Sequence, residues 1–195
     1  VAVKRKFLLL GSILLLIYLK LLCSIYYESI IINIILPGSE WHINWSMFNI
    51  ALYQPDIPQN TAAIIRLCSC FDTTLEIIEP CGFNLNDKRL KRIAMDYLDK
   101  SKIITHESYE KFLIKKKNSR IILMTTKAKK NYNSFKFSKK DTLLFGRESE
   151  GVPKIVYKNC YKRLKIPLKN SARSLNIGMA VAITLSEALR QSSNL

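Results

Sequence analysis

The sequence predicts an α/β domain in which helices flank a parallel sheet. From Phe48 onward, short apolar runs alternate with segments whose apolar residues recur at helical spacing. The apolar runs are nearly continuous, which is typical of strands that helices cover on both faces. Strands that alternate with helices along the chain also favour a parallel sheet. We therefore expect a layered domain with its strands in the middle.

Each element follows from a local pattern. The first predicted strand, FNIALY at 48–53, leads into a helix whose first turn contains Pro58, a position where the missing N–H of proline is not needed. Asp87 is well placed at the N-terminus of a second helix, 87–98. The lysine-rich stretch 127–141 is expected to be a solvated loop or an edge hairpin. The remaining strands are predicted at 75–79, 120–126, 141–146 and 161–168, and the remaining helices at 107–117 and 174–191.

The last predicted helix, 174–191, is apolar on nearly every face until Glu187. A helix of this kind must be buried on several sides. One layer of a small sheet covers only one side, so we expect a partner subunit to cover another. This predicts a homodimer that uses the last helix, and burial within a single chain is the alternative.

The charge of the chain favours a polyanionic partner. The chain carries 31 lysines and arginines against 15 aspartates and glutamates, a formal net charge of +16. Such a surplus suits RNA, DNA or an anionic membrane. A biased genome is the alternative, because the chain is rich in Lys, Ile and Asn. Residues 1–46 contribute four basic and two acidic side chains, so the basic character belongs to the remainder.

The cysteines and histidines form no pattern of metal ligands. The five cysteines include no CxxC pair, and His42 and His106 lie far from Cys68 and Cys70 in the sequence. A structural zinc site needs four clustered ligands of these types. We expect no metal, and we expect Cys68 and Cys70 to be reduced packing residues, which fits a cytoplasmic protein.

Residues 1–46 differ in character from the rest of the chain. Three basic residues precede an apolar run over 7–27 that only Lys20 interrupts. The run is close to the roughly 20 residues that cross a bilayer, so the segment would be a membrane anchor if it is translated and retained. Its Ile, Leu and Asn bias, and the strand pattern that begins directly after Met47, favour a second interpretation. In this interpretation the start is misassigned and the functional domain is 47–195.

Two loops beside predicted strand ends carry residues suited to chemistry, and ligands of parallel α/β sheets bind at such ends. The first loop, PDIPQNTAAIIR, places Asn60 near a helix start and Arg66 about two turns later. A helix cap and a surface arginine are the ordinary alternative. The second loop, LLFGRESEGVP, contains Gly146, which allows close approach of a ligand to the backbone, and Glu148, which can accept hydrogen bonds.

A third loop, IPLKNSARSLN, is rich in hydrogen-bond donors. It places Ser174 and Asn176 at the start of the last helix, where backbone amides can hold an anionic or polar group. The sequence contains no GxGxxG, GxxxxGK[ST] or GxSxG motif. This argues against an ordinary dinucleotide site, a P-loop and a serine hydrolase.

Taken in order, the three loops resemble the signature motifs of the SPOUT superfamily of RNA methyltransferases. Those motifs are N-T-x-x-x-x-R, F-G-x-E-x-x-G-[LV]-P and I-P-[ML]-x-x-x-x-[RS]-S-L-N, and this chain reads NTAAIIR, FGRESEGVP and IPLKNSARSLN. The segment IIEPCGFNLNDKRLKRIAMDYLD also resembles the branch that methylates the wobble ribose of tRNA, on cytidine or uridine. The resemblance covers Met47 to about Arg190.

The resemblance implies a fold, a cofactor and an assembly. Its sheet is parallel, and its C-terminal part forms a deep trefoil knot, which is a rare exception to the usual rules of chain threading. The knot binds S-adenosylmethionine, and family members are homodimers. The implied substrate is the anticodon stem-loop of tRNA. A ribose methyltransferase for another tRNA or rRNA site, or a non-catalytic RNA-binding relative, is the alternative.

The resemblance also assigns roles to residues. Arg66 is expected to bind the phosphate beside the target ribose and to stabilise negative charge on O2′, because an arginine does not deprotonate in proteins. The expected catalytic residues are Arg66, Asn60 and Ser174. The expected cofactor-binding residues are Met124, Thr125, Gly146, Glu148, Ile166, Leu168, Ser174 and Asn176. The expected RNA-binding residues are Lys88, Arg89, Lys91, Arg92 and Arg173, with a solvated helix face as the alternative for the first four.

Overall fold

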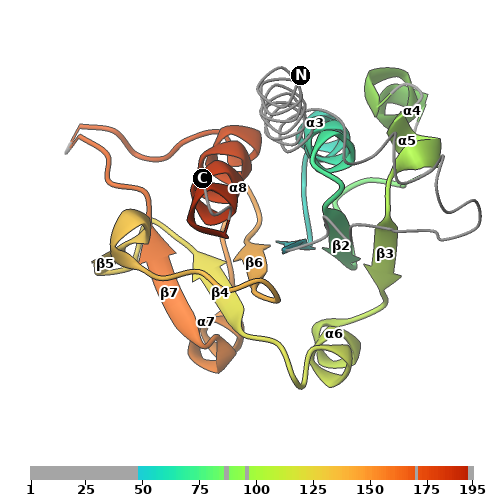
Figure 1. The fold of residues 1–195 in the computed structure, drawn as a ribbon. Helices are drawn as coiled ribbons and strands as arrows, with labels where there is room; N and C mark the ends of the chain where they lie inside the picture. Colours follow the sequence, from blue (N-terminus) through green and yellow to red (C-terminus); the bar gives the residue numbers. More distant parts are fainter. Residues whose placement is uncertain (1–47, 86–87, 95–96, 170, 193–195) are drawn as a thin grey trace, which may run out of the picture. The chain divides into compact units, whose positions relative to one another are not determined.

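The described strands form one parallel sheet. The computed structural model describes residues 48–85, 88–94, 97–169 and 171–192, all within the compact unit Asn44–Leu195. Within these residues the sheet has seven strands in the order β3-β2-β1-β6-β4-β7-β5, and each neighbouring pair is parallel (Figure 1). The strands are β1 (Asn49–Tyr53), β2 (Thr74–Ile78), β3 (Ile103–His106), β4 (Ile121–Met124), β5 (Lys130–Asn131), β6 (Thr142–Phe145) and β7 (Lys162–Lys165).

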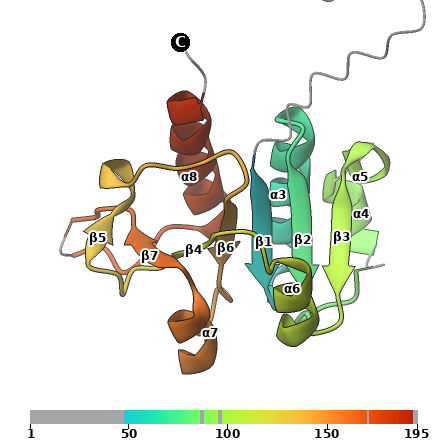
Figure 2. The same ribbon diagram turned by 60° about the horizontal axis from the view of Figure 1, so that its bottom comes forward.

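Helices cover both faces of the sheet. The long helices α3 and α8 lie side by side on one face, and α4 and α5 pack against α3 there (Figures 1 and 2). Helices α6 and α7 lie on the other face. The helices are α3 (Pro58–Cys70), α4 (Lys88–Ala94), α5 (Tyr97–Lys100), α6 (Tyr109–Lys115), α7 (Lys154–Asn159) and α8 (Ile177–Ser192), with a short 3-10 turn at Tyr132–Ser134.

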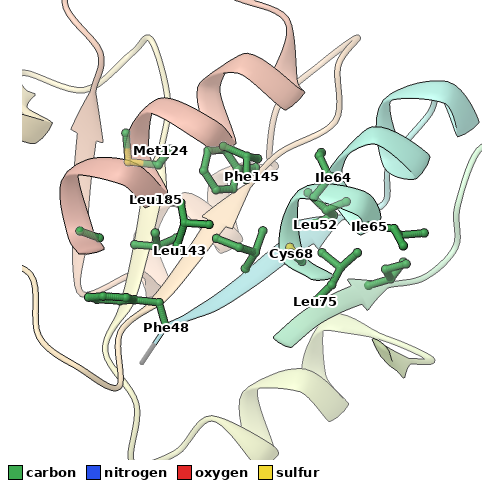
Figure 3. Close-up of a cluster of buried hydrophobic side chains, with 14 of the residues drawn as sticks. Phe48, Leu52, Ile64, Ile65, Cys68, Leu75, Met124, Leu143, Phe145 and Leu185 are labelled. Carbon is green, nitrogen blue, oxygen red and sulfur yellow. The ribbon is translucent and has the colours of Figure 1, made fainter. Parts of the chain in front are cut away.

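Each face of the sheet has its own apolar core. On the α3–α8 face, Leu52 and Leu143 from the strands pack with Ile64 of α3 and Leu185 of α8 (Figure 3). On the opposite face, Phe112 of α6 and Val156 of α7 pack against Ala51, Leu123 and Leu144. Strands β1, β2, β4 and β6 are therefore buried on both sides, which explains why their sequences lack a polar alternation. The predicted fold class, a parallel sheet flanked by helices, is confirmed, and the knot stays an implication of the resemblance.

Two edge strands differ from the prediction. Strand β3 was not predicted, because IITH is short and leaves Ile104 and Thr105 exposed. The lysine-rich stretch 127–141 is not a hairpin, since β5 pairs in parallel with β7. Its two phenylalanines, Phe135 and Phe137, are 7% and 6% exposed and join the core. They anchor a stretch that composition alone marks as solvated.

Helix ends and cysteines also differ in detail. Helix α8 begins at Ile177 instead of 174, because the Asn176 side chain accepts a hydrogen bond from the Gly178 N–H at 2.9 Å and caps the helix. The predicted helix 87–98 appears as α4 and α5, and residues 95–96 between them lie outside the described residues. Cys68 packs in the core, where burial raises the pKa of its thiol to about 12. Cys70 is exposed, so the prediction of a packing role for it was wrong.

Residues 1–47 lie outside the described part, so the predictions of a misassigned start or a membrane anchor stay predictions. Among the described residues, no helix is long and apolar enough to cross a membrane. The same residues contain no group of three or more His, Cys, Asp or Glu side chains that could hold a metal ion.

Candidate functional site

A cavity of about 760 Å³ lies at the carboxyl ends of β4, β6 and β7. Its wall is formed by the loops that follow these strands and by the starts of α3 and α8, and its volume is in the range typical of cofactor and small-molecule sites. The three sequence motifs therefore meet in one place. The wall includes all of the predicted cofactor-binding residues, namely Met124, Thr125, Gly146, Glu148, Ile166, Leu168, Ser174 and Asn176, together with Asn60 and Arg173.

Gly146 is required by the loop itself. Arg147 and Gly151 form an antiparallel bridge that closes the loop, with both backbone hydrogen bonds at 2.9 and 3.0 Å. A Cβ atom on Gly146 would lie 2.6 Å from the carbonyl carbon of Gly151, which is too close for any other residue type. Gly151 has a φ of 75°, in the region that favours glycine. The sequence prediction attributed the space at Gly146 to a ligand, but the structure fills it with the backbone of Gly151.

A chain of hydrogen bonds joins the three motifs. The Glu148 carboxylate accepts a bond from the backbone N–H of Asp56 at 2.9 Å and from the Asn60 side-chain amide at 3.1 Å. The Asn60 carbonyl oxygen accepts a bond from the Asn176 amide at 3.0 Å, and Asn176 caps α8. Asn60 is not a helix cap, because α3 is preceded by Ile57 with no side-chain cap. The cavity wall is thus held by side chains that are far apart in the sequence.

Asp56 is a site residue that sequence reasoning missed. Its carboxylate accepts hydrogen bonds from Arg147 Nε at 3.1 Å, from the Ser149 N–H at 3.2 Å and from the Ser149 hydroxyl at 2.6 Å. Partial burial alone would raise the pKa of Asp56, but the bonds from Ser149 and Arg147 outweigh it and hold this pKa below its ordinary value. A carboxylate three residues after strand β1 was the only signal in the sequence.

Arg66 does not line the cavity. It is exposed on α3, and its guanidinium carbon lies 5.1 Å from the centre of the Tyr97 ring. Lys88 and Arg92 are exposed on α4, which also contributes nothing to the described wall. The side chains of Arg89 and Lys91 lie outside the described residues. Of the predicted RNA-binding residues with described side chains, only Arg173 borders the cavity.

The cavity suits binding and positioning more than proton transfer. Its apolar surface comes from Met124, Ile166, Leu168, Ile177 and Ala180. The described lining residues include no histidine or cysteine, and Glu148 is already engaged with Asn60 and Asp56. The described wall therefore offers no imidazole or thiol for proton transfer, and its second carboxylate, Glu150, is 78% exposed.

Comparison with known proteins identifies the family. The model of the SpoU rRNA methylase family matches residues 47–186. The chain belongs to the SpoU rRNA methylase family. The family match spans all three motifs and every residue that lines the cavity. The predicted resemblance to RNA methyltransferases of this kind is confirmed.

Individual relatives are similar to this chain over most of their length. A tRNA (cytidine(34)-2'-O)-methyltransferase from Beijerinckia indica is 45% identical over 144 residues, which is 73% of this chain and 90% of that protein. The enzyme of the same name from Escherichia coli K12 is 37% identical over 147 residues, 74% of this chain and 94% of that protein. A solved structure described as giving insight into 2-OH methylation of C/U34 on tRNA is 34% identical, with a TM-score of 0.74, and covers 77% of this chain and 99% of that one.

Proposed function

We propose that this protein is an S-adenosylmethionine-dependent methyltransferase that modifies the ribose 2′-oxygen of the wobble nucleotide of tRNA, cytidine or uridine 34. The observation that carries the proposal is the meeting of the three motifs in one hydrogen-bonded cavity wall. Relatives that are 45% and 37% identical and bear this activity in their names support the substrate. A cytoplasmic location and the trefoil knot are part of the same proposal.

The cavity residues fit S-adenosylmethionine. The apolar side chains of Met124, Ile166 and Leu168 would cover the faces of the adenine ring, while strand-end backbone groups read its edge. When bound, this cofactor supplies a methyl group on a sulfonium, which is already a strong electrophile. The protein then needs to hold the ribose hydroxyl in line and to exclude water, and a described wall without an imidazole or a thiol is compatible with that task.

In this proposal, Arg66 stabilises the ribose oxygen that accepts the methyl group. Arg66 does not line the cavity of the described chain, but its guanidinium stays protonated. We assign it contact with the phosphate next to the target ribose, where it would stabilise negative charge that develops on O2′ when RNA is bound. Asn60, on the same helix, and Ser174 would orient the substrate from the cavity wall. The proton of the hydroxyl would leave to that phosphate or to water.

A homodimer that covers α8 is also part of the proposal. Helix α8 turns Val181, Leu185 and Ala188 to the core but leaves Met179 and Ile183 62% and 37% exposed. Apolar side chains at this exposure on a long helix suit burial by a second copy. Sedimentation of the purified chain tests this directly, and a monomer at micromolar concentration would contradict it.

The proposed function is tested by methyl transfer from labelled S-adenosylmethionine to unmodified bulk tRNA. We expect label at the wobble ribose, mapped by nuclease digestion because a 2′-O-methyl group blocks cleavage at the adjoining phosphate. Arg66→Ala should lose at least about 100-fold in rate, since removal of one group that stabilises an oxyanion has about this effect. Lys111→Ala, on α6, is the control and should retain the rate.

The other outcomes separate the alternatives. Label at a different ribose would keep the methyltransferase and reject the wobble position. Absence of label on either tRNA or ribosomal RNA, with cofactor binding intact in a calorimeter, would favour a non-catalytic RNA-binding relative.

A further inference from the structure

The positive charge of the chain is concentrated in one part of the sequence. Residues 120–173 contain 15 lysines and arginines but only three acidic residues, whereas residues 48–119 contain 11 and nine. The first range forms β4 to β7 and the loops of the cavity. The half of the sheet that carries the candidate site is therefore strongly basic, and the other half is nearly balanced.

The three acidic residues of the basic half neutralise little of its surface. Asp141 is 1% exposed and binds Arg120 through both carboxylate oxygens, each at 2.6 Å. Glu148 is held in the cavity wall by Asn60 and Asp56. Glu150 is exposed and lies 3.9 Å from Arg147. None of the three lies on β5 or β7, the outermost strands of this half of the sheet.

The pairing of β5 with β7 gathers five lysines at the edge of the sheet. Lys130 lies opposite Leu164, and Asn131 lies opposite Lys165, so two segments that are distant in the sequence run side by side (Figures 1 and 2). We call these side chains the basic edge. All except the half-buried Lys165 are exposed, and none forms an ion pair with an acidic residue in the part of the chain that the structure describes. The basic edge consists of Lys129, Lys130, Lys162, Lys165 and Lys169.

The basic edge is continuous with the cavity. Lys127 precedes it in the β4–β5 connection and Arg173 follows it in the loop before α8, and both side chains line the cavity wall. A chain of phosphates that lay on the edge would thus arrive at the cavity. Helix α4, by contrast, belongs to the nearly balanced half and does not reach the described wall.

We propose that the basic edge binds the phosphate backbone of the substrate tRNA and guides the target nucleotide into the cavity. The proposal rests on the proposed function, since it takes tRNA as the polyanion. Lysine contacts to phosphates position a nucleic acid without reading its sequence, and they make its affinity fall with salt. In this proposal the basic edge, and not α4, is the main phosphate-binding surface.

The test is the salt dependence of tRNA binding by the full chain. The triple variant Lys129→Gln, Lys130→Gln and Lys162→Gln should lower the slope of log Kd against log salt by about 2 to 3, because each lost phosphate contact changes the slope by somewhat less than one. Affinity at 0.1 M salt should fall about tenfold or more. The Kd for S-adenosylmethionine, measured in a calorimeter, should stay at the wild-type value and shows that the variant is folded.

A charge-matched control removes the same charge elsewhere. Lys111→Gln, Lys115→Gln and Lys117→Gln, all exposed and at or next to α6, should leave the slope near the wild-type value. Because Lys130 also lies 5.6 Å from the Phe135 ring, the double variant Lys129→Gln and Lys162→Gln repeats the test without it. An unchanged slope in the edge variants, or an equal loss in the control, overturns the proposal.

Failure of the edge and failure of the proposed function give different results. If the wild-type chain methylates tRNA and the edge variants retain its KM and salt slope, the edge is rejected and the function stands. If no tRNA is methylated but RNA binding depends on the edge, the surface stands and the function is rejected. If the edge variants lose binding to anionic vesicles while tRNA binding persists, the assignment to RNA is overturned.

Discussion

Two glutamates of this protein, Glu76 and Glu148, hold their surroundings together in opposite ways. Glu76 lies in the middle of β2, and its side chain is 2% exposed. One of its carboxylate oxygens is 2.8 Å from His106 Nε2 at the end of β3, and the other pairs with the Lys116 ammonium just after α6. Glu148 lies in a loop and is bound by two neutral donors, the Asp56 N–H and the Asn60 amide.

The difference follows from burial. A carboxylate removed from water needs a counter-charge close by, so Glu76 is matched to a cation and an imidazole and has nothing left to offer a ligand. His106 also meets Phe112 of α6 edge-on, at 5.2 Å between ring centres. Glu148 is only half-buried, so neutral donors suffice, and its bonds connect loops that border the cavity. We conclude that the first cluster serves stability and the second serves the arrangement of the site.

The largest effect is expected from breaking the buried cluster. Glu76→Gln leaves Lys116 and His106 without their counter-charge and should lower the free energy of unfolding by about 3 to 5 kcal/mol. Urea unfolding followed by circular dichroism measures this. Binding of S-adenosylmethionine by the remaining folded protein should be unchanged. Glu107→Gln, which removes an exposed carboxylate paired with Lys111, is the matched control and should unfold at nearly the wild-type urea concentration.

The second effect concerns the cavity and rests on the proposed function. Glu148→Gln should weaken binding of S-adenosylmethionine about 10- to 100-fold, because hydrogen bonds to a charged group contribute about 1.5 to 3 kcal/mol. A glutamine also turns an amide donor toward one of the two donors that Glu148 accepts from. Calorimetry gives the Kd, and stability should change less than in Glu76→Gln.

The control for that variant lies on the same loop. Glu150 is two residues away and also borders the cavity, but its side chain is 78% exposed and lies 3.9 Å from Arg147 instead of bonding to Asn60 or Asp56. Glu150→Gln should therefore bind the cofactor within about twofold of wild type. Equal losses of cofactor affinity in both variants would mean that binding depends on the total charge of the loop and not on the hydrogen bonds of Glu148.

The sequence predicted the cavity better than it predicted the contacts that build it. The three motifs could be located because each combines fixed residue types at fixed spacing next to a strand end. Glu148 and Asn60 were recognised, but their bond joins positions 88 residues apart, and no local pattern reports such a contact. Asp56 was missed for the same reason, since its partners Arg147 and Ser149 come from another loop.

The edges of the sheet were the least predictable part of the fold. Central strands such as β6 are buried along their whole length, so their apolar runs are unmistakable. Strand β3 and strand β5 have one neighbour each, and β5 contains only two residues. Their positions depend on pairing with β2 and β7, which is a long-range property. Arg66 shows what spacing does not predict about function. Its spacing from Asn60 correctly placed it on a helix, α3, but only the structure shows that it lies beside Tyr97 and outside the cavity wall.

A third and smaller effect is expected at Asp56. Its hydrogen bonds from Ser149 and Arg147 favour the ionised form, so Asp56→Asn should lower the free energy of unfolding by about 1 kcal/mol at pH 7. Because the pKa of Asp56 is lower in the folded chain than its ordinary value of 3.8, the wild-type advantage is present above that pH and is lost as the pH falls below it. Urea midpoints of both proteins between pH 7 and pH 2.5 measure the difference, and a gap that persists at the acid end would contradict this assignment.

The smallest effect is expected at Glu187, on the last turns of α8, where a carboxylate that is 15% exposed pairs with the exposed Arg190. Hydrogen bonds from Arg190 and then from Gln191 lower the pKa of Glu187 from 4.5 to about 2. Glu187→Gln should therefore lower Tm by about 1 to 2 °C at pH 7, because surface pairs of this kind contribute little. Since the folded pKa is the lower one, the difference in Tm should shrink as the pH falls from 4.5 toward 2. Scanning calorimetry at several pH values tests this. The Gln191 amide donates to Glu187 and also to the Phe135 carbonyl oxygen at 3.1 Å. A loss of stability as large as that of Asp56→Asn would therefore show that Glu187 acts through Gln191 and not through its pair with Arg190.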